Sequence, residues 1–139
     1  MSSTHVPVEL RRLVRARADG CCEYCRVDEA AGFALHEIDH IVAEKHGGRT
    51  TAENLALSCT LCNRRKGADL SSVDPEAGQI VPLFHPRKDR WPDHFRFDGA
   101  RIEALTPTGR ATARLLGFNS EARRSERAAS HAARPRPLL

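Results

Sequence analysis

The alternation of apolar and polar positions between residues 33 and 66 predicts a small α+β unit. Residues 33–41 alternate in the manner of a strand, and residues 55–58 form a short apolar run that predicts a second strand. A single turn is expected at residues 51–54. Residues 59–66 predict a helix that Gly67 ends. The order strand, loop, strand, helix needs about 35 residues for elements of these lengths.

A longer apolar pattern precedes this unit. Apolar side chains recur at helical spacing over residues 4–18, where Pro7 suits the first turn and Asp19-Gly20 form a stop signal. The arginines on the outer side of this helix are expected to face solvent, although they could also meet a nucleic-acid backbone.

The pattern after Gly67 is weaker. Residues 74–78 predict a turn and residues 79–84 a strand. Residues 86–92 are polar and irregular around Trp91, the only tryptophan. We expect Trp91 in a small satellite core rather than stacked on a nucleic-acid base.

The last third of the chain predicts a hairpin and two helices. Residues 95–105 surround an Asp-Gly turn, which is typical of a hairpin. A helix is expected over residues 106–116, with a threonine N-cap and a proline at its first position. A final helix begins at Asn119 or Ser120 and runs into an alanine-rich stretch, and residues 134–137 are expected to be disordered.

The composition indicates one small domain with an uneven charge. Only 5% of the 139 residues are aromatic and 29% are charged, so the core is small and a bound metal would help the chain to fold. The net charge is +4, yet residues 110–139 hold seven arginines against two glutamates. Such a segment is typical of an arm that touches a polyanion, although a solvated helix gives the same pattern. We therefore divide the chain into a domain, residues 1–118, and a basic helical or disordered tail, residues 119–139.

The sequence also favours a location. No apolar run approaches the roughly 20 residues of a membrane span, and the first residues lack the apolar stretch of a signal peptide. We expect a cytosolic protein without membrane contact, whose thiols stay reduced and whose paired cysteines bind metal rather than each other.

Two Cys-x-x-Cys motifs predict a structural zinc site. Cys22 and Cys25 form one pair and Cys59 and Cys62 the other. Each turn presents two thiolates, and four thiolates complete the tetrahedral shell of zinc with no position left for substrate. Each Cys-x-x-Cys turn is called a knuckle here. Cys21 belongs to neither knuckle, and a pair of Cys21 with Cys25 would be the poorer one, because three residues would separate the two cysteines. The alternative is that these cysteines are unligated members of the core.

A second set of polar residues lies between the two Cys-x-x-Cys motifs and just after the second one, in a recognisable order. It comprises Asp39-His40-Ile41, Gly47-Gly48, Asn54-Leu55 and Asn63-x-x-Lys66. Together with the two knuckles, this order resembles the HNH endonucleases, also called His-Me finger or ββα-metal nucleases. The resemblance covers a core motif of residues 22–67. Residues 68–118 look like the C-terminal extension of a bacterial subgroup.

The resemblance implies a role for each residue of the motif. His40 would be the general base that takes a proton from the attacking water. Asp39 and Asn63 would hold one divalent cation, and Asn54 would fix the catalytic loop and thereby orient His40. The position of Asn63 is often histidine in this family, so the chain is similar to an HNN variant.

The residues themselves agree with this chemistry. An imidazole with an ordinary pKa of about 6.5 is largely neutral at cellular pH and can accept a proton. The carboxylate of Asp39 and the carboxamide of Asn63 are hard oxygen donors, which favour Mg²⁺ or Mn²⁺. Neighbouring residues of a strand point to opposite faces, so the strand must end or bulge at Asp39-His40 for both to reach one phosphate.

Three basic residues follow Asn63 on the predicted helix. Lys66 lies one turn further along the same face, where it could touch a phosphate, and Arg64 and Arg65 are candidates for contacts to the backbone of the nucleic acid. We expect DNA as the substrate, with RNA as an open alternative. The sequence does not indicate an oligomeric state. Two alternatives remain: a zinc-dependent nucleic-acid-binding module without catalysis, and a zinc domain that binds protein.

Overall fold

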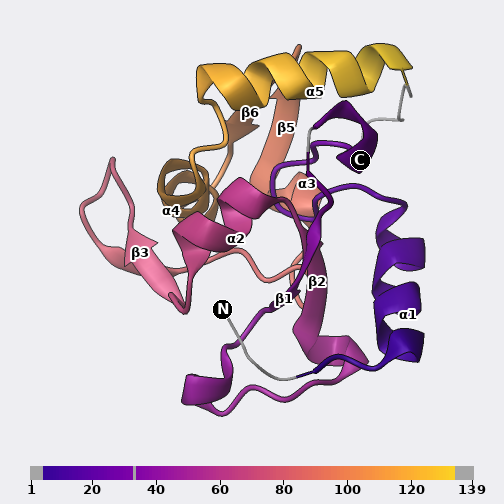
Figure 1. The fold of residues 1–139 in the computed structure, drawn as a ribbon. Helices are drawn as coiled ribbons and strands as arrows, with labels where there is room; N and C mark the ends of the chain where they lie inside the picture. Colours follow the sequence, from indigo (N-terminus) through magenta and orange to yellow (C-terminus); the bar gives the residue numbers. More distant parts are fainter. Residues whose placement is uncertain (1–4, 33, 134–139) are drawn as a thin grey trace.

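A two-stranded hairpin followed by a short helix forms the centre of the structure. Strand β1 (Glu37–His40) pairs antiparallel with β2 (Leu55–Ser58), and helix α2 (Thr60–Lys66) follows β2 directly (Figure 1). The Cys59 sulfur accepts a hydrogen bond from the Cys62 amide at the start of α2, and Gly67 ends the helix. The predicted second strand and helix are confirmed.

The computed structural model describes residues 5–32 and 34–133. The expected helix start at residue 4, the strand start at residue 33 and the disorder of residues 134–137 lie outside these ranges. Within them, no helix is long and apolar enough to cross a membrane.

Helix α1 (Val8–Ala18) packs against β2 through a small apolar cluster. Val14 is fully buried against Leu55 and Leu57. The Arg17 guanidinium donates to the Leu55 carbonyl at 2.5 Å, so this exposed arginine links the helix to the sheet. Three short 3₁₀ turns, Glu29–Ala31, Glu44–His46 and Ala52–Asn54, connect the elements of this half.

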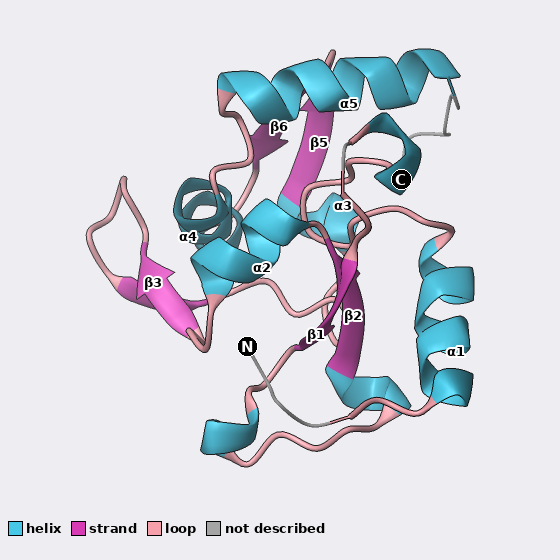
Figure 2. Ribbon diagram, viewed as in Figure 1, coloured by secondary structure: helices cyan, strands magenta, loops and turns pink. Residues whose placement is uncertain are grey.

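The remaining elements cover α2 and the hairpin from one side (Figures 1 and 2). They form two further hairpins and three helices, in the order β3 (Ser71–Val73), β4 (Ile80–Pro82), α3 (Trp91–His94), β5 (Phe95–Asp98), β6 (Arg101–Ala104), α4 (Pro107–Leu116) and α5 (Glu121–Ala133). Both hairpins are antiparallel. Mixed helices and small hairpin sheets around a cysteine cluster confirm the predicted α+β class.

An aromatic stack joins the two halves. The Trp91 ring lies 5.1 Å from the Phe95 ring and 5.0 Å from the Phe97 ring, and its Nε1–H donates to the Tyr24 carbonyl at 2.9 Å. The same core cluster contains the cysteines of both knuckles. Our expectation of a satellite core for Trp91 was wrong, because this side chain bridges the C-terminal elements to the first knuckle.

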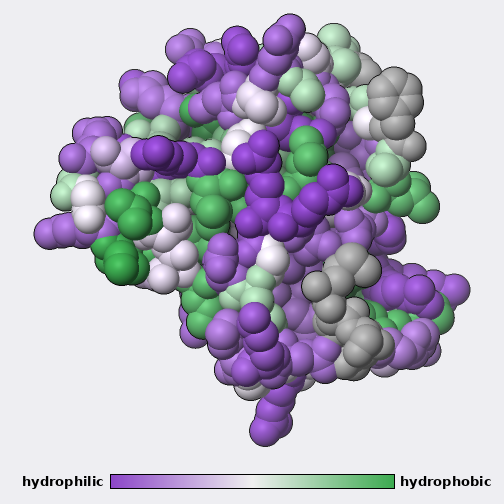
Figure 3. Space-filling view, turned by 60° about the vertical axis from the view of Figure 1, so that its left-hand side comes forward, coloured by the Kyte–Doolittle hydropathy of each residue, from purple (hydrophilic) through white to green (hydrophobic). Residues whose placement is uncertain are grey.

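The other differences from the sequence-based expectations fall where local signals are weak. The first strand begins at Glu37 and is shorter than expected, and the segment around Trp91 contains a single helical turn instead of irregular chain. Strand β3 was not predicted. It is short and exposed, and its cross-strand pair of Val73 and Ile80 faces solvent. Figure 3 shows hydrophobic groups on the side of the molecule that carries this hairpin.

A buried ion pair attaches the β3–β4 hairpin to α4. Arg110 donates to both carboxylate oxygens of Asp74, at 2.9 and 2.8 Å, and the Asp74 side chain is fully buried. The hydrogen bonds from Arg110 lower the pKa of Asp74 to about 2. Because this value lies below the ordinary one, the ionised carboxylate stabilises the fold at neutral pH.

We expect Asp74→Asn to lower the denaturant midpoint at pH 7. The difference from wild type should stay constant above about pH 4 and vanish as the pH falls from 4 towards 2, because the wild-type carboxylate then takes up its proton. Chemical denaturation of both proteins at each pH measures this difference. Loss of metal in acid affects both proteins equally and so cancels in the comparison. Glu103→Gln, in an exposed pair with Arg96, serves as the control and should have little effect.

Candidate functional site

The four cysteines of the two knuckles meet at one buried point. Cys22, Cys25, Cys59 and Cys62 are buried, and their sulfur atoms all lie within 4.8 Å of one another. The sulfurs of Cys25 and Cys59 are 3.7 Å apart. A zinc ion with Zn–S bonds of 2.3 Å sets about 3.8 Å between sulfurs in a regular tetrahedron. The donor set therefore fits zinc in type, number and spacing.

The chemistry of the four thiols also calls for a cation. Hydrogen bonds, those with Cys22 foremost, raise the pKa of Cys25 and of Cys62 well above the ordinary value. The four groups cannot all ionise in this buried space unless a positive ion balances them. Cys21 is buried as well, but its sulfur lies outside the cluster and contacts the Cys22 carbonyl at 3.7 Å.

Two arginines of α5 complete the surroundings of this cluster. Arg123 donates to the Cys59 sulfur at 3.0 Å. Burial alone lowers the pKa of Arg123, but the negative sulfurs of Cys59 and Cys25 outweigh burial and raise it. The predicted tail is thus a helix packed on the domain through part of its positive charge, rather than a free basic arm. The domain boundary at residue 118 stays a prediction.

Arg127 is the largest fully buried side chain among the described residues, and it joins three parts of the chain. Its guanidinium donates to the carbonyls of Cys25 at 3.0 Å and Phe118 at 2.6 Å, and to that of Ala100. Burial lowers its pKa, and the neighbouring cysteines oppose this shift. One side chain therefore connects α5 to the first knuckle, the β5–β6 turn and the end of α4.

The loop after β1 is held by the side chain of Asn54. Its Oδ1 accepts from the Val42 amide at 2.9 Å, and its Nδ2 donates to the carbonyls of Val42 and Arg49, each at 2.9 Å. The main chain adds a bond from the Ile41 amide to the Asn54 carbonyl at 2.8 Å. These four bonds fix both ends of the loop relative to His40. The role of Asn54 in orienting a catalytic His40 stays a prediction.

Gly48 makes this closure possible. A Cβ at this position would overlap the Val42 carbonyl oxygen and would lie 2.8 Å from Asn54 Nδ2. Because a backbone atom is involved, no side-chain rotation can relieve the overlap. The loop can close against β1 only with glycine at this position.

His40 is the last residue of β1, and it faces the loop. Its Nε2 lies 2.9 Å from the Thr50 hydroxyl oxygen, and its side chain is almost completely buried. His40 pairs with Leu55 in the hairpin, whereas Asp39 pairs with Ala56. Both residues pair regularly in β1, so their side chains point to opposite faces, and the strand ends only after His40, without the bulge that would bring both to one side.

The Asp39 carboxylate points into a polar cluster on the other face. Its Oδ2 accepts from the Tyr24 hydroxyl at 2.8 Å and forms an ion pair with Lys66 at 3.2 Å. Burial raises the pKa of Asp39, although Lys66 and Tyr24 oppose the rise. Burial and the nearby Asp39 also raise the pKa of Tyr24, which therefore remains a donor.

Lys66 corrects an expectation. Its ammonium is buried and also donates to the carbonyls of Ile41 at 2.9 Å and His40 at 3.3 Å. In this structure it anchors the end of β1 rather than offering a free charge to a phosphate. Arg64 and Arg65 are exposed on α2, and their contacts with nucleic acid stay predictions.

Asn63 lies on α2, half-buried, one turn before Gly67. Within the described part of the chain its carboxamide makes no side-chain hydrogen bond, and Oδ1 of Asp39 likewise has no hydrogen-bond partner. These two hard oxygen donors fit a small divalent cation in type. Their roles as ligands stay predictions.

Four residues of the site were missed by sequence reasoning: Tyr24, Thr50, Arg123 and Arg127. Tyr24 lies between the two cysteines of the first knuckle, and this position next to the motif could have identified it. Thr50 carries no motif of its own. The two arginines contact residues 64 and 102 positions away, so no local pattern could place them.

Comparison with protein families now assigns this segment. Residues 22–69 match the family described as HNH endonuclease. The resemblance drawn from the sequence is confirmed over this segment, and the cysteine cluster agrees with an HNH domain of the zinc-binding kind. The family connects the chain to nuclease or related nucleic-acid activity. No curated protein and no solved structure matched the chain.

We expect Arg127→Met to weaken zinc retention. The substitution keeps an apolar stem of similar length but removes three hydrogen bonds, and each buried carbonyl left unsatisfied costs about 1–3 kcal/mol. Wild type should hold one zinc ion per chain, and the variant should lose it to a chelator several times faster in a chromogenic zinc-release assay.

The matched control is Arg124→Met on the same helix. Arg124 is exposed and makes one bond, to the Asn119 carbonyl. Equal release rates for both variants would show that α5 does not support the metal site.

Gly48→Ala tests the closure of the loop. The added methyl group should push the Val42 carbonyl away and break its bond with Asn54, so the Val42 amide should exchange with deuterium at least tenfold faster. Gly32→Ala is the control, since its Cβ would find its nearest neighbour at an ordinary 3.8 Å. Unchanged exchange in Gly48→Ala would contradict the described packing.

Proposed function

We propose that this protein is a metal-dependent endonuclease that hydrolyses phosphodiester bonds in DNA, with His40 as the general base. The observation that carries the proposal is the position of His40 at the end of β1, facing a loop that Asn54 holds by three side-chain hydrogen bonds. This arrangement lies within the segment that matches the HNH endonuclease family. The preference for DNA over RNA and a cytosolic location are parts of the proposal.

The Thr50 hydroxyl supports a defined tautomer of His40. If Nε2–H donates to Thr50 Oγ1, the lone pair resides on Nδ1, which makes no hydrogen bond to the described residues. Nδ1 is then the atom that accepts a proton from the attacking water. Thr50 acts as a positioning residue that keeps the ring in this orientation.

Asp39 and Asn63 are the residues we assign to a divalent cation, Mg²⁺ or Mn²⁺. They stand on adjacent elements, β1 and α2, and each offers an oxygen without a partner among the described residues. Such a cation, when bound, polarises the phosphate and stabilises charge on the departing oxygen.

The contacts of Asp39 give the site a dependence on pH. Tyr24 and Lys66 both hold Oδ2, which leaves Oδ1 directed away from this pair for an outside ligand. Because burial raises the pKa of Asp39, protons compete for the carboxylate over a higher pH range than for an exposed aspartate. Both this carboxylate and the base His40 must be deprotonated, so activity should decline on acidification.

One observation favours a second candidate function. In this structure Lys66 and Thr50 occupy polar atoms of Asp39 and His40, as expected if these residues only stabilise a zinc fold. A zinc-dependent nucleic-acid-binding module without catalysis is therefore the alternative. It differs from the nuclease in needing no second metal.

We expect the purified protein to nick supercoiled plasmid in Mg²⁺ or Mn²⁺, and His40→Ala to reduce the rate at least 100-fold, the lower range for loss of a general base. EDTA should abolish cutting by removing the catalytic cation. Zinc content measured in the same samples shows that the structural site remains loaded.

The outcomes separate the candidates. Equal cutting by wild type and His40→Ala would remove His40 from the mechanism. Salt-sensitive retention of DNA by both proteins without any cutting would favour the binding module. Ser125→Ala, at an exposed position of α5, is a suitable control for general effects of substitution.

A further inference from the structure

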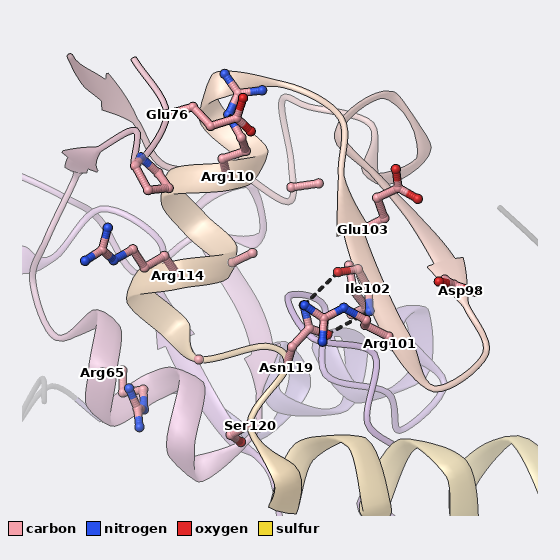
Figure 4. Close-up of a pocket in the computed structure, with 14 residues that line it drawn as sticks. Arg65, Glu76, Asp98, Arg101, Ile102, Glu103, Arg110, Arg114, Asn119 and Ser120 are labelled. Atoms are coloured by element: carbon pink, nitrogen blue, oxygen red, sulfur yellow. Dashed lines mark hydrogen bonds and ion pairs between the residues drawn. The ribbon is translucent and has the colours of Figure 1, made fainter. Parts of the chain in front are cut away.

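A polar cleft of about 640 Å³ lies on the side of α2 where α4 packs (Figure 4). Its walls come from five parts of the chain: α2, the β3–β4 turn, the β5–β6 hairpin, α4 and the loop that leads to α5. Four arginines line it: Arg65, Arg101, Arg110 and Arg114. Neither knuckle and none of the proposed catalytic residues contributes to its lining.

The acidic residues of the cleft are partly neutralised from within the protein. Glu103 is paired with Arg96, and Glu76 is paired with Arg110, which also holds Asp74. Asp98 is the one lining carboxylate that forms no ion pair with the described residues. Because two carboxylates share the single charge of Arg110, the three remaining arginines outnumber the two unbalanced carboxylates by one, and the cleft keeps a small positive excess.

Those arginines have no counter-charge of their own. Arg65, Arg101 and Arg114 are exposed, and no ion pair or side-chain hydrogen bond engages any of them within residues 5–32 and 34–133. They come from three separate elements, α2, β6 and α4, yet they surround one hollow. Three unpaired guanidinium groups around one cleft attract an anion with several oxygen atoms.

The walls of the cleft are held in place. The Asn119 carboxamide donates to the Ile102 carbonyl and accepts from the Ile102 amide, both at 2.8 Å (Figure 4). Arg65 lies against Gly117, where a Cβ would come within 3.0 Å of the guanidinium carbon. The cleft is therefore preformed on its inner side, and only the ends of the arginines need to adjust to a ligand.

The position of the cleft connects it to the proposed nuclease site. Helix α2 contacts β1 on one side and α4 on the other, so it separates the catalytic loop from the cleft. Asn63 and Arg65 are two residues apart on this helix, about 3 Å along its axis. Residues two apart project from nearly opposite sides of a helix, so a nucleic-acid strand bound at both sites passes around α2.

We propose that this cleft binds backbone phosphates of the DNA substrate beside the cleaved bond, through Arg65, Arg101 and Arg114. The proposal rests on the proposed function, since it assigns a binding surface to the same substrate. Guanidinium forks suit phosphate oxygens, and contacts of this kind position a strand without reading its sequence. The cleft replaces Lys66, which is buried, as the main source of phosphate contacts.

The test measures binding separately from cutting. Fluorescence anisotropy with a labelled 20-base-pair duplex compares two double variants in the His40→Ala background, across salt concentrations. Arg101→Ala/Arg114→Ala removes two charges from the cleft, and Arg11→Ala/Arg12→Ala removes two exposed charges from α1, on another side of the molecule. We expect the cleft variant to bind at least about tenfold more weakly and to lower the salt slope by about 1.8, at about 0.9 per phosphate contact. The α1 variant should change both quantities much less.

Three results would overturn the proposal. Equal losses in both variants would show that only total charge matters, and unchanged affinity in the cleft variant would remove the cleft from binding. If the wild-type chain cuts plasmid, either of these two results rejects the role of the cleft but does not affect the proposed nuclease function. Absence of both cutting and low-salt binding by the wild-type chain would reject the proposed function and the cleft together. Zinc content and the near-ultraviolet circular dichroism spectrum verify that each variant is folded.

Discussion

The buried charge of four clustered thiolates is the constraint on which the rest of the structure depends. A zinc ion would balance half of that charge and leave a net negative centre inside the domain, and a buried charge is costly without partners. Arg123 lies on a ligand sulfur, and Arg127 bonds to the backbone of the first knuckle. The two knuckles, the β5–β6 turn and α5 are thereby joined at one point, and the aromatic stack around Trp91 packs beside it.

The candidate active site depends on this centre through short connections. Tyr24 lies between the two cysteines of the first knuckle and reaches Asp39, while α2 begins at the second knuckle and places Lys66 below the end of β1. Asn54 and Gly48 then close the loop that His40 faces. A metal at the cysteine cluster would take no part in the proposed chemistry, yet it would fix the elements that carry the candidate residues.

Local signals were sufficient for much of this arrangement. The α2 and α4 caps, the β5–β6 hairpin and the cysteine pairs all depend on residues close in sequence, and the structure contains each of them. The orientation of Lys66 could not be predicted, because α-helical spacing gives a face but not what that face meets. The partners of Trp91 and Arg127 could not be predicted for the same reason, since they lie 67 and 102 residues away.

The separation between Arg127 and Cys25 has a consequence for how the chain is made. A ribosome releases both knuckles before it has synthesised α5, so zinc can be captured while the ligand cluster still lacks the guanidinium groups that later surround it. Until α5 docks, the cluster is open to solvent and competing thiols on that side. A metal bound at the cysteine cluster would therefore gain the contacts of Arg123 and Arg127 only after α5 has been made.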